Sequence, residues 1–316
     1  TKGENMNKLK KIGLTALGTA LVSTSVSAVE MGISGSASMT LTGKEKADAG
    51  NSWSMGDTLT FSASGDMDNG WSISYMQDLD AGTQDNSSIA IGMGDMGTLT
   101  FIGTGGTGVV QAWDDVMPYA NEEVLGVTFA VAATAAQTGA SGSNMFRYSN
   151  EIMEGATVHL GYVPGAAGAK EGSVDYGIQY TGVEGLDIGF ATGDNNTTAS
   201  NEIEGTSMYA KYAIDAFTIG IQNNETDQQS ASADSDTRIY AVSYAVSDDL
   251  SVSYAQSNTE YENSSLTDQS GSNFGISFTN GGLSVTASYH EVDNAAGSTA
   301  AANDLSAYEI NFGFAF

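Results

Sequence analysis

The sequence predicts an all-β fold, a transmembrane antiparallel β-barrel of about 16 strands. Three observations indicate this fold. Apolar and polar side chains alternate in segments along most of the chain, which places them on opposite faces of strands. The chain ends on one large apolar face, formed by Tyr308, Ile310, Phe312, Phe314 and Phe316. After residue 30, no stretch approaches the roughly 18 to 20 continuous apolar residues of a membrane-spanning helix, so a membrane protein with this sequence would cross as a barrel.

The alternating segments are distributed along the whole chain after residue 30. Their apolar sides fall at 33–41, 59–63, 71–75, 89–93, 99–101, 146–148, 158–162, 176–180, 186–190, 208–212, 217–221, 240–244, 250–254, 274–278, 283–289 and 308–316. Short turns separate some of them, and longer polar loops are expected near 43–52, 78–86, 164–172, 193–205, 224–236, 258–271 and 292–303. Short turns at one end and long loops at the other are typical of outer-membrane barrels.

The strand count depends on the apolar run 125–134. If this run is a wall strand, the later short turns lie on the wrong side of the membrane. If it belongs to one long loop, residues 104–143, the count is about 16 and all later connections have a consistent polarity. We therefore expect about 16 strands, a size that leaves an aqueous channel. The conformation of residues 125–134 within the loop stays open.

Composition restricts the class of protein further. The 316 residues include no Cys, and ten Lys and Arg stand against 38 Asp and Glu, for a formal net charge of -28. The absence of cysteine excludes a disulfide scaffold and cysteine-bound metals. Nucleic acid binding requires clustered cations that neutralise phosphates, so we expect no nucleic acid partner.

Residues 1–28 have the pattern of a leader with a removable secretory signal peptide. A basic segment, residues 8–11, precedes a short apolar run, residues 12–22, and small residues just before position 29 suit cleavage after Ala28. The apolar run is too short to span a membrane, which disfavours an N-terminal anchor. The mature chain, residues 29–316, is then expected to be a single β-barrel domain.

The sequence resembles the general, non-specific outer-membrane porins of Gram-negative bacteria. The features that carry this resemblance are the signal peptide, the alternation, the long loop after the fifth strand, the segment 144–149 that follows the loop, and the terminal Phe316. The resemblance covers about residues 29–316 and rests on architecture more than on local motifs. It implies a water-filled channel for passive diffusion of small hydrophilic solutes and ions, with no enzyme activity and no cofactor. It also implies a homotrimer in the outer membrane, in contact with lipid and lipopolysaccharide. In that family, a terminal aromatic residue such as Phe316 is the assembly signal that the barrel-insertion machinery reads.

In the same family, the third extracellular loop folds into the barrel and faces basic residues on the wall. In this chain, the resemblance implies that residues 104–143 correspond to that loop and form the constriction. The acidic side of the constriction would be Asp114, Asp115, Glu122 and Glu123. Four carboxylates within ten residues create a negative field that a low-dielectric wall concentrates along the pore.

The basic side of the constriction is sparse in this sequence. Arg147 and Lys211 each alternate with apolar neighbours, so both are expected to face the lumen as the basic part of the pore wall. Arg238 shares the parity of Tyr240 and is expected on the outer side, near the rim. Two lumen cations fall short of the basic ladder typical of the family, which favours a preference for cations.

Other motifs carry weaker predictions. His159 and His290 are expected to face water in the lumen, and neither has a partner at metal-ligand spacing. Acidic loop residues, at 234–236 and 248–249, leave Ca²⁺ binding open. The glycine spacing of 103–108 matches a dinucleotide fingerprint, but no βαβ unit surrounds it.

Two alternative functions stay open. One is a substrate-selective outer-membrane channel, in which Trp53, Trp113 or tyrosines line a binding track. The other is a secreted acidic β-rich surface or adhesin protein, because alternation alone does not distinguish a barrel with an apolar exterior from a sandwich with an apolar core.

Overall fold

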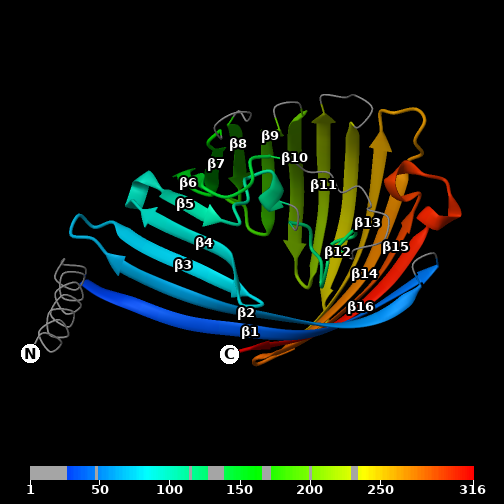
Figure 1. Ribbon diagram of the computed structural model, residues 1–316, viewed down its shortest axis with the longest axis horizontal. Helices are drawn as coiled ribbons and strands as arrows, with labels where there is room; N and C mark the ends of the chain where they lie inside the picture. The colour runs from blue at the N-terminus through cyan, green and yellow to red at the C-terminus, as the bar shows by residue number, and fades with distance from the viewer. Residues whose placement is uncertain are drawn as a thin grey trace, which may run out of the picture.

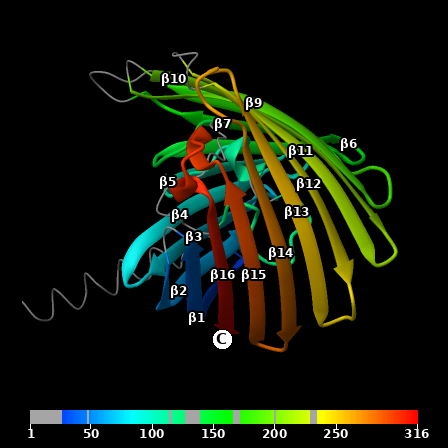
Figure 2. The same cartoon turned by 90° about the vertical axis from the view of Figure 1, so that its right-hand side faces the viewer.

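The computed structural model describes residues 27–46, 49–113, 116–126, 139–165, 172–198, 201–228 and 234–316. These residues form one closed barrel of 16 antiparallel strands, in which each strand pairs with its sequence neighbours and β16 pairs with β1 (Figures 1 and 2). The predicted fold class and strand count are confirmed. No helix in the described part of the chain is long and apolar enough to cross a membrane. Residues 1–26 of the expected leader lie outside these ranges, so the signal peptide stays a prediction.

The strands differ in length, and the first two are the longest. Their bounds are β1 (Ser27–Lys46), β2 (Gly50–Asp66), β3 (Ser72–Asp80), β4 (Thr83–Gly92), β5 (Thr98–Thr104), β6 (Met145–Met153), β7 (Ala156–Val163), β8 (Ser173–Tyr180), β9 (Leu186–Thr198), β10 (Asn201–Ile214), β11 (Phe217–Gln228), β12 (Ser235–Ala245), β13 (Leu250–Tyr261), β14 (Gln269–Asn280), β15 (Leu283–Asp293) and β16 (Leu305–Ala315).

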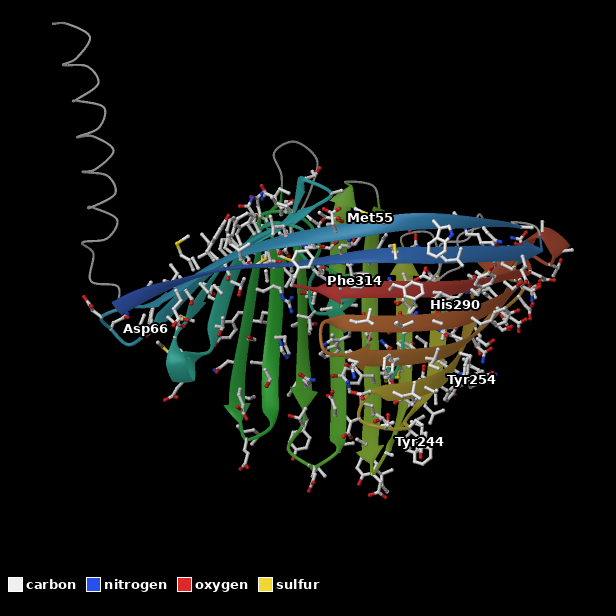
Figure 3. The ribbon with its side chains drawn as sticks, turned by 90° about the horizontal axis from the view of Figure 1, so that it is seen from below. Met55, Asp66, Tyr244, Tyr254, His290 and Phe314 are labelled. Carbon is white, nitrogen blue, oxygen red and sulfur yellow. The ribbon has the colours of Figure 1, made fainter. Side chains whose placement is uncertain are left out.

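The apolar side of the alternation lies on the outside of the barrel. Tyr176, Ile219 and Phe274 are 54%, 52% and 51% exposed, although a soluble sandwich would bury such residues in its core. Figure 3 shows Tyr244 and Tyr254 on the outer side of the wall. The inward positions are mostly Ser, Thr, Asn and Gly. An apolar exterior around a polar interior is the arrangement of a barrel in lipid.

Most of the expected long loops are shorter in the structure, because the strands continue beyond the apolar band. The loop expected at 78–86 is a two-residue turn, Ala81–Gly82, and the loop expected at 193–205 is mostly strand. Beyond the apolar band, at the end of the barrel with the longer connections, both faces of a strand are polar, as where Glu225 pairs with Asp236. Backbone hydrogen bonds between strands do not require apolar side chains, so loss of the alternation marks the edge of the apolar band and not the end of the strand. The connection 164–172 has its expected bounds.

The two ends of the wall meet where β16 pairs with β1. The N–H of Gly35 donates to the carbonyl oxygen of Phe316 at 2.8 Å, and the N–H of Phe316 donates to that of Gly35 at 2.9 Å. The ring of Tyr308 lies over Gly43, where a Cβ atom would meet it. The last residue of the chain is therefore part of the hydrogen-bonded wall, while its role as an assembly signal stays a prediction.

At the end with the short turns, Gly97 follows the 3-10 helix η1 (Gly94–Met96) and packs against β6. Its φ is +80°, and a Cβ atom there would meet the carbonyl oxygen of Ser149 and lie 3.0 Å from the Cα of Asn150. Gly70 has a similar φ of +84°, with no atom within 4 Å of such a Cβ. The two glycines therefore separate the effect of backbone conformation from that of close packing.

Gly97→Ala is expected to destabilise the barrel more than Gly70→Ala. Both substitutions place a side chain in the left-handed region, at about 1 to 2 kcal/mol. Gly97→Ala also forces the turn away from β6, which adds about 1 to 3 kcal/mol. Urea unfolding of the protein folded in lipid vesicles measures the difference. Equal losses in the two variants would show that the contact with β6 does not stabilise the wall.

Candidate functional site: the channel and its inward-folded loop

The segment that follows β5 enters the barrel and packs on its inner wall. A short 3-10 helix, η2 (Gln111–Trp113), forms in this segment. It lies within the barrel in Figure 1. The apolar residues of this segment that are buried against inward-facing residues of β9, β10, β12 and β13 are Val109, Val110, Trp113, Met117 and Val124. The alternation of the wall explains this contact, because the inward positions there are small or amphipathic, as at Ala191 and Tyr209.

Side chains of β10 and β11 hold the first part of the loop by its backbone. The amide of Gln222 donates to the carbonyl oxygen of Trp113 at 2.7 Å. The ammonium of Lys211 donates to the carbonyl oxygen of Val116 at 3.1 Å. Gln222 is fully buried in this position. These polar inward residues therefore satisfy loop carbonyls that packing removes from water.

Side chains of β13, β14 and β15 hold the next part of the loop. The N–H of Ala120 donates to the hydroxyl of Ser253 at 2.8 Å, and the amide of Asn273 donates to the carbonyl oxygen of Glu123 at 3.1 Å. His290 lies 3.1 Å from the carbonyl oxygen of Val124 through its Nδ1, which must carry the proton because a carbonyl only accepts. The loop thus follows the inner wall across several strands, attached at nearly every step.

Asp175 on β8 fixes the root of the loop. Its Oδ2 accepts hydrogen bonds from the N–H of Val109 at 2.6 Å and from that of Val110 at 3.3 Å. The returning limb approaches the same atom, since a Cβ on Gly139 would lie 3.0 Å from it. Asp175 is fully buried, and its neighbours across both strand pairings are Gly161 and Gly193. Asp175 is not among the predicted site residues, although its inward parity and its two glycine neighbours are typical of a place where another segment approaches the wall.

Each predicted basic residue lies on the face of the wall that the alternation predicts, but the environments of these residues differ. Lys211 is on the inner wall, but its Nζ lies 3.2 Å from the Oδ2 of Asp187 and it also binds the loop. Arg147 is on the inner wall of β6 and lines a pocket. Arg238 is on the outer side, 3.5 Å from Asp236 and 3.7 Å from Glu260. The lumen therefore contains one predicted cation that an ion pair neutralises and one that lines open space.

Only part of the predicted acidic set can be placed. Glu122 is exposed and Glu123 half-buried, in the stretch that Asn273 holds against the wall. Asp114 and Asp115 lie outside the described residues, as do residues 127–138 of the apolar run. The structure therefore places two of the four carboxylates inside the barrel, and the constriction itself stays a proposal.

The expected environment of His290 is wrong, and the two tryptophans named for a substrate-selective channel do not line the lumen. His290 faces inward but is fully buried under the loop, so it does not face lumen water. Trp113 is 7% exposed because the loop packs it against the inner wall, and Trp53 is 64% exposed on the outer face, so neither lines a solute track. Parity indicates the face of a strand but not what covers that face. His159 does face inward and lines the same pocket as Arg147.

A metal site is not found within the described ranges, where no three His, Cys, Asp or Glu side chains gather in a way that could hold an ion. In the connection after β11, Asp234 accepts a hydrogen bond from the N–H of Gln228 at 2.7 Å.

A closed barrel with an apolar exterior, a polar interior and a loop folded inward defines a channel protein of the outer-membrane type. The family model described as Gram-negative porin matches residues 13–316, and the chain belongs to that family. It is therefore an outer-membrane channel protein for diffusion and not an enzyme. No match is found among the curated proteins.

Solved porins share the fold at low sequence identity. The anion-selective porin from Comamonas acidovorans superposes with a TM-score of 0.71 at 11% identity, over 92% of this chain and 100% of that chain. OmpT of Vibrio cholerae gives 0.70 at 15% identity, over 92% and 98%. OmpF of Salmonella typhi, in complex with daunomycin, gives 0.70 at 12% identity, over 90% and 97%. At these identities the likeness carries the fold and not the selectivity.

Asp175→Ala is expected to loosen the loop at its root. The substitution leaves two buried N–H groups without their charged acceptor, each hydrogen bond being worth about 1.5 to 3 kcal/mol. The open channel should therefore show greater current noise, and conductance should rise where the loop leaves the lumen. Single-channel recording in planar bilayers measures both. Asp227→Ala, on the exposed outer side of β11, removes the same charge and should match the parent; if Asp175→Ala matches it too, Asp175 does not hold the loop.

Proposed function

We infer that the channel passes small hydrophilic solutes and ions by passive diffusion, with a preference for cations, and that residues 104–143 form its constriction. The observation that carries this inference is the pairing of Lys211 with Asp187 at 3.2 Å, which removes one of the two predicted wall cations from the lumen field. Carboxylates of the loop, Glu122 and Glu123, lie inside the barrel, and Asp114 and Asp115 are proposed to extend the same acidic side. The excess of negative groups would concentrate cations in the pore.

The likeness to an anion-selective porin does not argue against this preference. That relative is 11% identical, so wall charges differ freely between the two chains. Selectivity depends on which charges line the pore, and a shared backbone does not fix them.

The remaining expectations extend the proposal beyond one chain. We infer that the protein is exported through a cleaved signal peptide and that Phe316 is its assembly signal. The proposed assembly is a homotrimer that contacts outer-membrane lipid and lipopolysaccharide. The wide apolar exterior supports the contact with lipid, and the pairing of the terminal strand makes Phe316 part of the wall that assembly must close.

Replacing Glu122 and Glu123 together by Gln is expected to reduce the preference for cations. Removing two lumen charges weakens the local negative field, so the ratio of potassium to chloride permeability should fall by roughly twofold or more. The reversal potential in a salt gradient across a planar bilayer measures this ratio.

A matched control is the double change Glu202→Gln with Glu204→Gln, which removes the same charge from the exposed outer side of β10. It should keep the parent ratio. A parent channel that prefers anions would contradict the proposed selectivity, and a protein that inserts without conducting would contradict the channel itself.

A further inference from the structure

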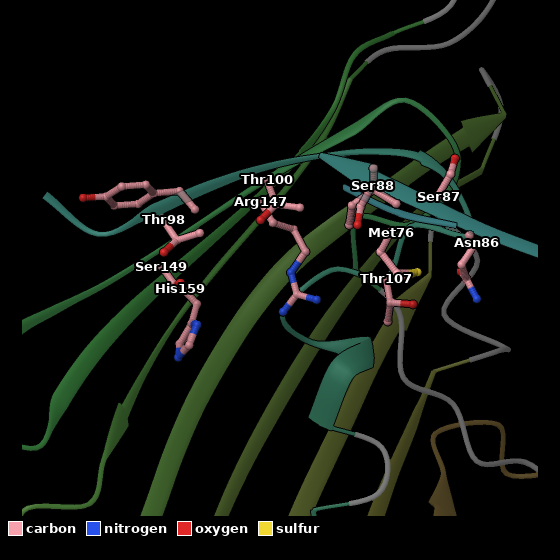
Figure 4. A pocket seen from close by; sticks show the side chains of 13 residues that line it. Met76, Asn86, Ser87, Ser88, Thr98, Thr100, Thr107, Arg147, Ser149 and His159 are labelled. Atoms are coloured by element: carbon pink, nitrogen blue, oxygen red, sulfur yellow. The ribbon is translucent and has the colours of Figure 1, made fainter. Parts of the chain in front are cut away.

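The inner wall of β3 to β7 carries a pocket of about 410 Å³ beside the first residues of the inward loop (Figure 4). This volume lies within the range of small-molecule sites, which begins at roughly 300 Å³. Figure 4 shows the side chains of Arg147 and His159 extending to the same side from neighbouring strands. The pocket therefore combines enough space for a small solute with charged and polar groups that converge on it.

Arg147 is the permanent cation of this pocket, and no Asp or Glu is among the residues that line it. Within the described part of the chain, Arg147 makes no hydrogen bond or ion pair. Its electrostatic neighbour Asp175 is buried, with one carboxylate oxygen bound to two N–H groups of the loop. The guanidinium thus keeps its planar set of donors available, and this geometry matches a carboxylate through two parallel hydrogen bonds.

Hydroxyl groups line the pocket together with Arg147. Thr100 lies directly across from Arg147 in the pairing of β5 with β6, and Ser149, the next inward residue of β6, lies opposite His159. On the other side of Arg147, the cross-strand neighbour is Gly161, where the carboxylate of Asp175 and the end of the Met145 side chain fill the space that a side chain would take. Ser88 and Thr107 also line the pocket, beside the apolar Met76 and Ile102, and their hydroxyls can both donate and accept hydrogen bonds.

We propose that this pocket is a docking site for small hydroxylated monocarboxylates, such as hydroxy acids and sugar acids, on their way through the channel. The carboxylate pairs with Arg147, and the solute hydroxyls exchange hydrogen bonds with the Ser and Thr side chains around it. The proposal rests on the proposed channel function in one respect, that solutes reach the pocket from the lumen. It does not depend on the preference for cations.

The charge of the pocket favours a monocarboxylate over phosphate. Arg147 offers a single permanent positive charge, whereas a phosphate group carries about -1.5 to -2 at neutral pH. The second negative charge would remain uncompensated in a chain with a formal net charge of -28. The hydroxyl lining in turn favours a hydroxylated solute over a simple fatty acid, because an alkyl chain would leave those groups without partners.

Equilibrium dialysis of radiolabelled gluconate against the full-length protein in detergent tests the proposal. Gluconate is expected to bind weakly and saturably, and to be displaced by other hydroxylated monocarboxylates. Acetate, glucose and inorganic phosphate at the same concentration should displace it less, since each lacks the hydroxyls, the carboxylate or the matching charge. Equal displacement by acetate would overturn the role of the hydroxyls, and equal displacement by phosphate would overturn the choice of ligand class.

Variants of the pocket make the test specific. Arg147→Gln should weaken gluconate binding by about tenfold or more, because it removes a charged hydrogen-bond partner. Arg147→Lys should retain part of the affinity, since it keeps the charge but loses the planar fork. Arg238→Gln removes the same charge from the outer side of β12 and should bind gluconate like the parent. Equal binding by Arg147→Gln and Arg238→Gln would overturn the proposal.

Dialysis separates this proposal from the proposed function, because binding is measured without current. A protein that binds gluconate through Arg147 but does not conduct supports the pocket and contradicts the channel. A protein that conducts, with no saturable gluconate binding, contradicts the pocket and leaves the channel intact. In a conducting protein, gluconate should also reduce single-channel current in the parent and in Arg238→Gln more than in Arg147→Gln.

Discussion

The structure depends on one constraint: inside lipid, every backbone N–H and C=O must find its partner within the protein. A closed sheet satisfies the constraint only if its first and last strands pair, which β1 and β16 do down to the reciprocal bonds between Gly35 and Phe316. Alternation follows from closure, because one face of each strand then meets lipid and the other meets the interior. The constraint ends where lipid ends, and the strands there continue with polar residues on both faces.

The loop inside the barrel must likewise find hydrogen-bond partners for its backbone N–H and C=O groups. Its backbone groups leave water when it packs on the wall, and inward side chains take the place of that water. Gln222, Asn273 and His290 each bind a loop carbonyl, and Asp175 binds two loop N–H groups. The polar inward side chains of β8 to β15 therefore largely bind this loop, and only some of them are left to line the path of solutes. The wall of β3 to β7, where Arg147 faces a pocket, keeps side chains that solutes can meet.

These two roles explain how far the sequence could predict the structure. Period-two alternation reports which face a residue is on, so it predicted the barrel, its strand count and the inward position of Arg147. It does not report what lies against the inner face, and so it placed His290 in lumen water. It also failed to find Asp175, whose importance comes from a contact with residues more than 60 positions earlier in the chain. Loop lengths were overestimated because alternation measures the apolar band, whereas strand length is set by backbone pairing.

The two inward cations show that the position of a charged side chain does not decide whether its charge is available to a passing ion. From parity alone, Arg147 and Lys211 are equivalent lumen cations, and a count of charges would treat them alike. In the structure, Lys211 is used twice, by the carboxylate of Asp187 and by a loop carbonyl, while Arg147 forms neither kind of bond with the described residues. A cation that already has an anionic partner at 3.2 Å contributes little net field to a passing ion, because the two charges largely cancel beyond their own separation. A count of lumen charges therefore has to leave out those that the fold has already paired, as it has paired Lys211 with Asp187.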